Sequence, residues 1–116
     1  MEEKKTKRSW TLETARAMMD EVRRRTESAV LDVDPLVAER DATDPGAQER
    51  LDLDRRIQQR ISVWVRSMEA LGVEVKGLWL VDFDCGSGYY CWKWPEEHLA
   101  YFHGYEEGFA GRTRIQ

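Results

Sequence analysis

The stretch from Leu78 to Arg112 constrains the fold most, because it holds ten of the twelve aromatic residues, both cysteines and both histidines. It reads LWLVDFDCGSGYYCWKWPEEHLAYFHGYEEGFAGR. Aromatic and β-branched residues suit the pleated, half-buried surface of a sheet. The segment before it is highly charged and places its apolar residues at helical spacing. We therefore expect an α+β fold in which an aromatic sheet packs on helices.

A chain of 116 residues has the length of one domain. Apolar residues make up 41% of it, which is enough for a modest core. We expect a single domain over residues 1–116. Within it, the pattern predicts a flexible lead-in over residues 1–10, a helical hairpin over 11–72, and an aromatic β-meander with a C-terminal loop over 73–116.

The net charge of -4 gives no basic field of the kind that attracts nucleic acid or anionic membranes. Clusters such as Arg23-Arg24-Arg25 and Arg55-Arg56 have acidic neighbours, so a solvated helix face explains them better than nucleic-acid binding. No apolar run has the length of a membrane span, and the opening MEEKKTKRSW has no apolar signal core. We expect a cytoplasmic protein that does not bind membranes, with nucleic acid the least favoured partner.

A first helix is predicted from Thr11 to near Asp32. Thr11 can cap it, but Thr14 stands where Glu or Gln would complete a capping box, so we expect a half-built cap. Pro35 disfavours helical geometry in the residue before it, so we expect the helix to end there and a short turn to follow over residues 36–40.

A second helix is predicted from the cap-and-proline pair Asp44-Pro45 to about Leu71, where Gly72 stops it. In both helices the apolar positions alternate steps of three and four, as in a coiled-coil seam. A short connection between two such helices favours an antiparallel hairpin. Because each seam is narrow, we expect the sheet or a second copy to cover it, and we predict a homodimer formed through the helices.

Three strands are predicted after the hairpin, over residues 78–83, 89–94 and 99–103, as an antiparallel meander. If Phe83 faces Tyr89 across the first loop and Trp94 faces Leu99 across the second, one face carries a polar row made of Asp82, Tyr90 and His103. A slip of one residue in either hairpin would move a strand's side chains to the other face. The tail after His103 is expected to be a structured loop.

The candidate polar site therefore comprises Asp82, Tyr90, His103 and Arg112. Asp82 could orient or charge His103 for acid–base work, and Arg112 could hold an anion. The candidate ligands for a divalent metal are His103, Asp82, Glu106 and Glu107. The alternative is a sheet face whose few polar groups satisfy one another, which the lack of a recognised ligand spacing favours.

The two cysteines have no metal-ligand spacing and are expected to be free thiols. Cys91, among apolar neighbours, is expected to be a small core residue, and Cys85 the more exposed thiol. Only Lys76 and Lys93 accompany the aromatic residues of the strands, against four acidic residues, so packing onto the helices explains the aromatic residues better than base stacking.

Several motifs together resemble one prokaryotic family, domain of unknown function 2203. They are Thr11-Leu12-Glu13, Leu71-Gly72-Val73-Glu74-Val75-Lys76, Leu80-Val81-Asp82-Phe83, Cys91-Trp92-Lys93, Tyr101-Phe102-His103 and Gly108-Phe109-Ala110-Gly111-Arg112. The resemblance covers nearly the whole chain and implies a small cytosolic protein without an established activity. The chain departs from the family pattern at Phe102, Thr14 and Arg114, and the family does not share Cys85.

Three functional hypotheses follow. The first, favoured by the seams and by the absence of a recognised catalytic or phosphate-binding motif, is a non-enzymatic homodimeric module for protein interaction or regulation. Its partners would be a second copy and an unidentified protein. The second is a metal-dependent or acid–base site around His103, Asp82 and Arg112, with a divalent metal as the cofactor. The third is weak nucleic-acid binding through the arginine clusters.

Overall fold

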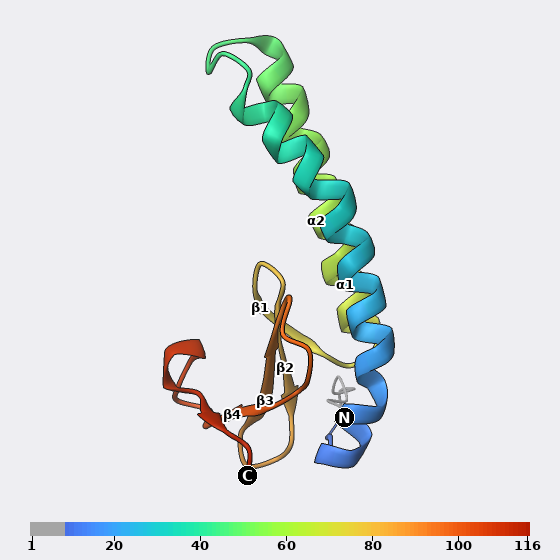
Figure 1. Ribbon diagram of the computed structural model, residues 1–116, viewed down its shortest axis with the longest axis vertical. Helices are drawn as coiled ribbons and strands as arrows, with labels where there is room; N and C mark the ends of the chain where they lie inside the picture. Colours follow the sequence, from blue (N-terminus) through green and yellow to red (C-terminus); the bar gives the residue numbers. More distant parts are fainter. Residues whose placement is uncertain (1–8) are drawn as a thin grey trace, which may run out of the picture.

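The computed structural model describes residues 9–116, and residues 1–8 lie outside that range. A pair of long helices precedes an antiparallel sheet with strand order β1-β2-β3-β4-β5 (Figure 1). The elements are α1 (Leu12–Asp41), α2 (Gln48–Ala70), β1 (Glu74–Gly77), β2 (Leu80–Asp84), β3 (Tyr89–Lys93), β4 (Tyr101–His103), the short 3-10 helix η1 (Phe109–Gly111) and β5 (Thr113–Arg114). The α+β class is confirmed, but the sheet has five strands instead of the three predicted.

Helix α1 begins at a complete capping box. The Thr11 hydroxyl accepts a hydrogen bond from the Thr14 backbone N–H, and the Thr14 hydroxyl accepts one from the Thr11 N–H, both at 3.0 Å. The prediction of a half-built cap was wrong, because the shorter threonine side chain reaches the same backbone donor that Glu or Gln would reach.

The same helix continues through Pro35 to Asp41, although the sequence predicted an end near Asp32. Proline inside a helix removes one backbone hydrogen bond and costs about 3 kcal/mol. Here Val33 is buried, and Leu36 and Val37 pack partly buried against the core. Because the longer helix buries these apolar side chains, their burial offsets that cost, and tertiary packing overrides the local signal.

Helix α2 begins later than predicted. Asp44 and Pro45 form a turn, in which the Ala47 N–H donates to the Asp44 carbonyl at 3.0 Å, and the helix starts only at Gln48. Ala47 occupies the N-cap position and makes no side-chain cap. The predicted end near Leu71 agrees with the observed end at Ala70.

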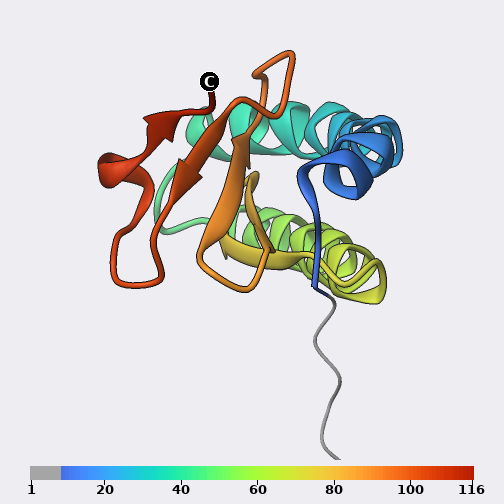
Figure 2. The same ribbon diagram turned by 90° about the horizontal axis from the view of Figure 1, so that it is seen from below.

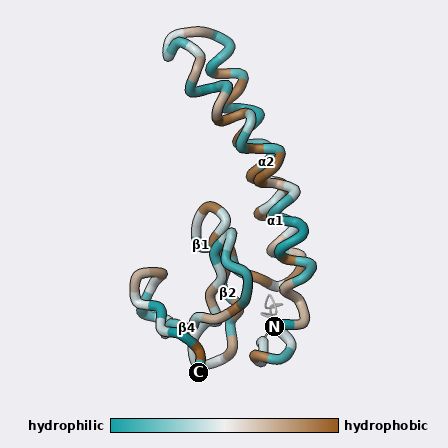
Figure 3. The backbone as a smooth tube through the Cα atoms, viewed as in Figure 1, coloured by the Kyte–Doolittle hydropathy of each residue, from teal (hydrophilic) through white to brown (hydrophobic). Residues whose placement is uncertain are grey.

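The helices run side by side as an antiparallel hairpin (Figure 2). Two polar contacts stabilise the pairing of the helices. Trp64 Nε1 donates a buried hydrogen bond of 2.9 Å to the Thr26 hydroxyl, and Arg60 forms an ion pair of 2.7 Å with Asp32. Hydrophobic and hydrophilic residues alternate along both helices (Figure 3), as one buried stripe per helix requires. The buried positions are Ala15, Met19, Val22, Thr26, Ala29, Val30 and Val33 in α1, and Leu53, Ile57, Trp64 and Met68 in α2.

One face of the sheet packs on the N-terminal half of α1 and the C-terminal half of α2. Val81, Phe83 and Trp92 point to this face, and each has no exposed surface. Trp79, in the turn between β1 and β2, packs edge-on against Trp64 with ring centroids 4.9 Å apart. The aromatic residues therefore join the sheet to the hairpin, as the composition predicted.

Trp10 belongs to this core, although the sequence placed it in a flexible lead-in. Its side chain is only 3% exposed and packs edge-on against Phe83. Its backbone N–H donates to the Asp84 carbonyl at 2.8 Å, and its indole N–H donates to the Gly72 carbonyl at 3.2 Å. The chain is therefore anchored from Trp10 onward.

The two additional strands lie at the sheet edges. The segment from Glu74 to Gly77 pairs with β2, and the strand predicted to begin at Leu78 begins only at Leu80, because Leu78 and Trp79 form a tight turn between the two strands. Trp79 adopts a positive φ of 58°, a conformation that costs energy for a bulky residue and that the packing of its ring on Trp64 helps to hold. At the other edge, β5 is only two residues long, too short to be predicted from its composition.

Candidate metal-binding site

The pairing of β2, β3 and β4 differs by one residue from the predicted register in each hairpin. Asp82 pairs with Cys91 instead of Tyr90, and His103 pairs with Tyr89 instead of Tyr90. Each difference of one residue places the side chains of β3 on the opposite face relative to one neighbouring strand. Because both hairpins differ by one residue, the faces of β2 and β4 remain matched to each other as predicted. Asp82 and His103 therefore still share a face, but Cys91 takes the place predicted for Tyr90.

Tyr90 lies on the opposite face, where it packs partly buried against the core and contacts Phe102 with ring centroids 6.2 Å apart. It is therefore not part of the polar cluster. The face that carries Asp82, Cys91 and His103 points away from the helices, and these side chains are only 1%, 1% and 3% exposed. The C-terminal segment covers them.

Asp82 and His103 make a direct contact of 2.9 Å between the carboxylate oxygen Oδ2 and the ring nitrogen Nε2. The other ring nitrogen, Nδ1, lies 2.9 Å from the Gly104 carbonyl oxygen. A carbonyl oxygen only accepts hydrogen bonds, so Nδ1 carries a hydrogen and the orientation of the ring is fixed. Nε2 is then the atom that faces the carboxylate.

The second oxygen of Asp82, Oδ1, is buried and has no hydrogen-bond partner among residues 9–116. A buried carboxylate oxygen without a partner is costly, so its retention points to a group that completes the site. The nearest cation is Lys76, whose Nζ lies 3.6 Å from Oδ2 of Asp82 and 3.6 Å from Glu74, and sits over the Tyr89 ring at 3.9 Å. Burial would lower the pKa of Lys76, but Tyr89, Asp82 and Glu74 raise it, so the amine stays charged.

Cys91 is the third polar member of this face. One donor atom each from Asp82, Cys91 and His103 can be chosen so that all three lie within 4.8 Å of one another. Without a metal ion, burial and the neighbouring Asp82 carboxylate raise the pKa of the Cys91 thiol to about 12, so the thiol keeps its proton at neutral pH, and a bound ion would have to displace that proton. Both ring nitrogens of His103 already have other partners, the Gly104 carbonyl and the Asp82 carboxylate. The high pKa of the thiol and these contacts argue against Cys91 as a nucleophile activated by His103.

A cavity of about 350 Å³ opens beside the cluster. This volume is at the lower end of the range for pockets that bind small molecules. Strand residues and the C-terminal segment share its wall, which is lined by Lys76, Leu80, Asp82, Cys91, His103, Glu107, Gly108 and Phe109. The cluster therefore has a covered but accessible side.

The side chain of Arg112 is fixed by an ion pair and by two aromatic rings. Its guanidinium forms a two-pronged pair with Glu96 at 2.8 and 3.1 Å and lies between the rings of Tyr101 and Phe109, 3.9 and 4.1 Å from their centroids. Its distance to the Cys91 sulfur is 4.0 Å. The side chain therefore fastens the C-terminal segment over the site, and its donors are already directed at Glu96.

The two glutamates predicted as metal ligands do not join the cluster. Glu107 lines the cavity, but its carboxylate accepts a hydrogen bond of 2.7 Å from the Gly104 N–H and so closes the turn after β4. Glu106 is exposed and lies outside the set of donor atoms that converge on one point. Their closeness to His103 in sequence therefore does not translate into a shared ligand set.

One family of known proteins matches almost the entire chain. The model of that family, described as "Uncharacterized conserved protein (DUF2203)", matches residues 8–115. The chain belongs to the DUF2203 family. The resemblance drawn from the sequence motifs is thereby confirmed. Searches of the curated proteins and of the solved structures found no match.

The described residues of this DUF2203 protein contain no helix with the length and apolar character needed to cross a bilayer. Its Asp82, Cys91 and Arg112 fall within motifs that carry the family resemblance, as does His103. Family membership, however, assigns none of these residues a chemical role. The case for a site therefore rests on geometry.

Sequence reasoning on this DUF2203 chain missed Cys91 and Lys76. It assumed a five-residue loop between β2 and β3, whereas Asp84 pairs with Tyr89 and the Cys85 N–H donates to the Gly88 carbonyl at 2.9 Å. The loop is therefore one residue shorter at its β2 end. A register shifted by one residue would have placed Cys91 beside Asp82. That alternative register was the signal in the sequence that could have identified Cys91 as a member of the site.

Proposed function

We propose that this DUF2203 protein binds a transition-metal ion of the zinc class through Asp82, Cys91 and His103. The observation that carries the proposal is the convergence of one oxygen, one sulfur and one nitrogen donor within 4.8 Å on a buried sheet face. Zinc accepts these three donor types, with bonds of about 2.0–2.3 Å. Donors bound to one such ion lie roughly 3–4 Å apart, so only small side-chain movements are required.

The hydrogen bonding of His103 supports this assignment. Histidines that bind metals through one ring nitrogen usually donate the other N–H to a carbonyl or carboxylate, which fixes the ring. Here Nδ1 donates to the Gly104 carbonyl, and Nε2 is directed at Asp82. A metal ion would take the place of the proton between Nε2 and the carboxylate.

The cavity and the unpartnered Asp82 oxygen also support the proposal. Three protein ligands leave a fourth position of a zinc ion open, which is the pattern of sites that bind a water molecule or a substrate. The cavity of about 350 Å³ provides room for it. We infer a site that holds its ion through three residues and exposes it to a small ligand beneath the C-terminal segment.

Two cations near the cluster oppose metal binding and make the proposal sharply testable. Lys76 lies 3.6 Å from Asp82, and Arg112 lies 4.0 Å from the Cys91 sulfur. Arg112 is paired with Glu96, and Lys76 has a second carboxylate in Glu74. An incoming ion would therefore weaken the contact between Lys76 and Asp82 while leaving the other contacts of Lys76 in place.

The first experiment uses protein purified without a histidine tag and titrated with Co²⁺, which replaces zinc and reports a thiolate ligand by its charge-transfer absorption. We expect such absorption in the wild type and in Cys85→Ser, and its loss in Cys91→Ser. Zinc should bind at least ~10-fold more weakly to Cys91→Ser, because even residues behind the ligands commonly contribute 10–100-fold. Mg²⁺ should not compete, since it prefers oxygen ligands.

A second arm uses the opposing cation. Lys76→Gln removes a positive charge 3.6 Å from Asp82 and should increase zinc affinity by about tenfold, roughly 1.4 kcal/mol. Lys93→Gln, on the same sheet, is the control and should leave affinity unchanged. If zinc neither binds nor raises the unfolding temperature of the wild type, or if Cys85→Ser abolishes the cobalt signal, the metal assignment is wrong and the cluster only satisfies its own polar groups.

A further inference from the structure

The helical hairpin continues well past the sheet, so the upper halves of α1 and α2 have no sheet beside them (Figure 1). Each helix presents an edge there that the sheet does not cover. Both edges carry an exposed large apolar residue, Leu31 on α1 with 66% exposure and Val63 on α2 with 47% exposure. Exposed apolar residues in a defined charged setting are typical of interaction surfaces.

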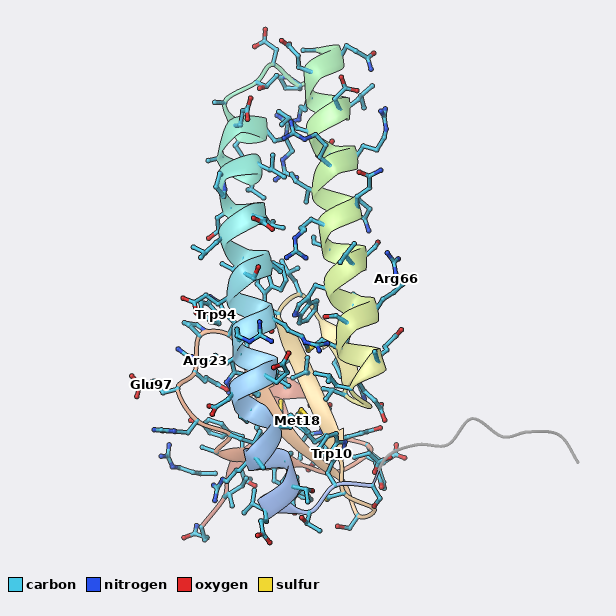
Figure 4. All side chains as sticks on the ribbon, turned by 90° about the vertical axis from the view of Figure 1, so that its right-hand side faces the viewer. Trp10, Met18, Arg23, Arg66, Trp94 and Glu97 are labelled. Atoms are coloured by element: carbon cyan, nitrogen blue, oxygen red, sulfur yellow. The ribbon has the colours of Figure 1, made fainter. Side chains whose placement is uncertain are left out.

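The α2 edge is basic. Between Asp54 and Glu69 the helix contains four arginines and no acidic residue. Arg66 projects from α2 on the side away from α1 (Figure 4). Arg56 and Arg66 are exposed and form no ion pair with residues 9–116. Two surface hollows of about 580 and 440 Å³ meet at Gln59 and Val63, and the second reaches across to Asp32 and Leu36 of α1.

The α1 edge has the opposite charge. Glu27 and Asp34 flank Leu31 at helical spacing, so all three lie on one side of the helix. These residues are exposed, and neither carboxylate forms an ion pair within the part of the chain that the structure describes. One chain therefore carries both a basic edge and an acidic edge, each centred on one apolar residue.

We propose that copies of this protein associate side by side, with the acidic α1 edge of one copy against the basic α2 edge of the next. We name the two surfaces the acidic edge (Glu27, Leu31, Asp34) and the basic edge (Arg56, Gln59, Val63, Arg66). Leu31 would pack into the hollows beside Val63, and the carboxylates would meet the unpaired arginines.

The levels of the two edges along the hairpin agree with this arrangement. Within one chain, Thr26 is level with Trp64 and Asp32 is level with Arg60, because these pairs are bonded. A second copy displaced sideways without an axial shift therefore brings Leu31 to the turn of α2 between Gln59 and Val63. The same displacement brings Glu27 close to the level of Arg66, and Asp34 close to that of Arg56.

The contact joins two different surfaces, so it is heterologous and need not close after two copies. The end copies retain one unused acidic edge and one unused basic edge. We therefore expect the mean mass to rise with protein concentration beyond that of a dimer. Because the flanking charges are exposed, high salt should weaken the association.

The test uses two variants and their mixture, studied by light scattering coupled to size-exclusion chromatography. Leu31→Arg places a cation on the acidic edge, and Val63→Asp places an anion on the basic edge. Each variant alone should remain a single chain of 13.6 kDa at concentrations where the wild type associates, with an association constant at least ~10-fold lower. An equimolar mixture should associate again, because each variant retains the edge that the other lacks.

Both positions are exposed, so circular dichroism should show both variants folded. If Leu31→Arg alone still associates, the basic edges pair with each other and the proposal is wrong. A wild type that remains a single chain at all concentrations also overturns it. If the basic edge instead binds an acidic polymer such as heparin while copies do not associate, it serves another kind of partner. The association does not involve Cys91, so Cys91→Ser should associate normally whether or not zinc binds.

Discussion

Gly88 lies just before β3, at a point where the chain passes close to β4. A Cβ atom at this position would stand 2.6 Å from a ring carbon of Phe102 and 2.7 Å from the carbonyl oxygen of His103. Real Cβ atoms do not approach backbone oxygen so closely, and β4 cannot move without shifting His103. Because the side chain of Gly88 is only a hydrogen, β4 can lie close enough for the imidazole of His103 to contact Asp82.

We accordingly predict that Gly88→Ala destabilises the fold by about 1–3 kcal/mol, the usual range for forcing extra volume into a packed site. Urea unfolding followed by tryptophan fluorescence would measure this change. The matched control is Gly46→Ala in the turn between the helices, where no atom lies within 4 Å of the added carbon. That control should change stability by less than about 1 kcal/mol. Equal effects of the two substitutions would contradict the close approach.

At the scale of elements, the hairpin is held together by a polar contact inside an apolar seam. The Thr26 hydroxyl is completely buried and accepts the indole N–H of Trp64. Trp64 also packs on Trp79, so this hydrogen bond orients the ring that joins α2 to the β1–β2 turn. The contact therefore links the pairing of the helices to the position of the sheet.

Thr26→Val keeps the side-chain shape but leaves the buried indole N–H without an acceptor. The expected loss of stability is about 1–3 kcal/mol, because an unsatisfied buried donor costs its full desolvation energy. Thermal unfolding monitored by circular dichroism would measure it. Thr43→Val, whose hydroxyl donates to Glu39 at an exposed helix end, should cost less than about 0.5 kcal/mol. A neutral Thr26→Val would indicate that the indole finds another acceptor.

At the scale of the whole molecule, the core is concentrated at one end. Five large aromatic side chains belong to the buried cluster there, namely Trp10, Trp64, Trp79, Phe83 and Trp92, and the sheet covers only that part of the hairpin (Figure 1). The far end, around the turn at residues 42–47, has only the narrow seam between two helices. Stability should therefore decline from the sheet toward this turn.

Native-state hydrogen exchange would detect this gradient. Amides in β2, β3 and the C-terminal half of α2 should exchange only through global unfolding, whereas those near Asp41 and Gln48 should exchange through local opening. The expected difference in protection is several powers of ten, since local opening costs much less free energy than global unfolding. Uniform protection along both helices would mean that association or another contact covers the distal hairpin.

The α+β class and the hairpin followed from the sequence alone, because helical periodicity and strand composition are local properties, and the family followed from short motifs. Predictions from local sequence failed where contacts between residues far apart in the chain determine the structure. Helix α1 continues through Pro35, Trp10 is buried in the core, and β1 and β5 extend the sheet at its two edges. The pairing of Asp82 with His103 was predicted, but Cys91 was not, since a register error of one residue exchanges the faces of a strand. Only the tertiary structure could decide that register, because it depends on the loop length and on which side chains the helices bury.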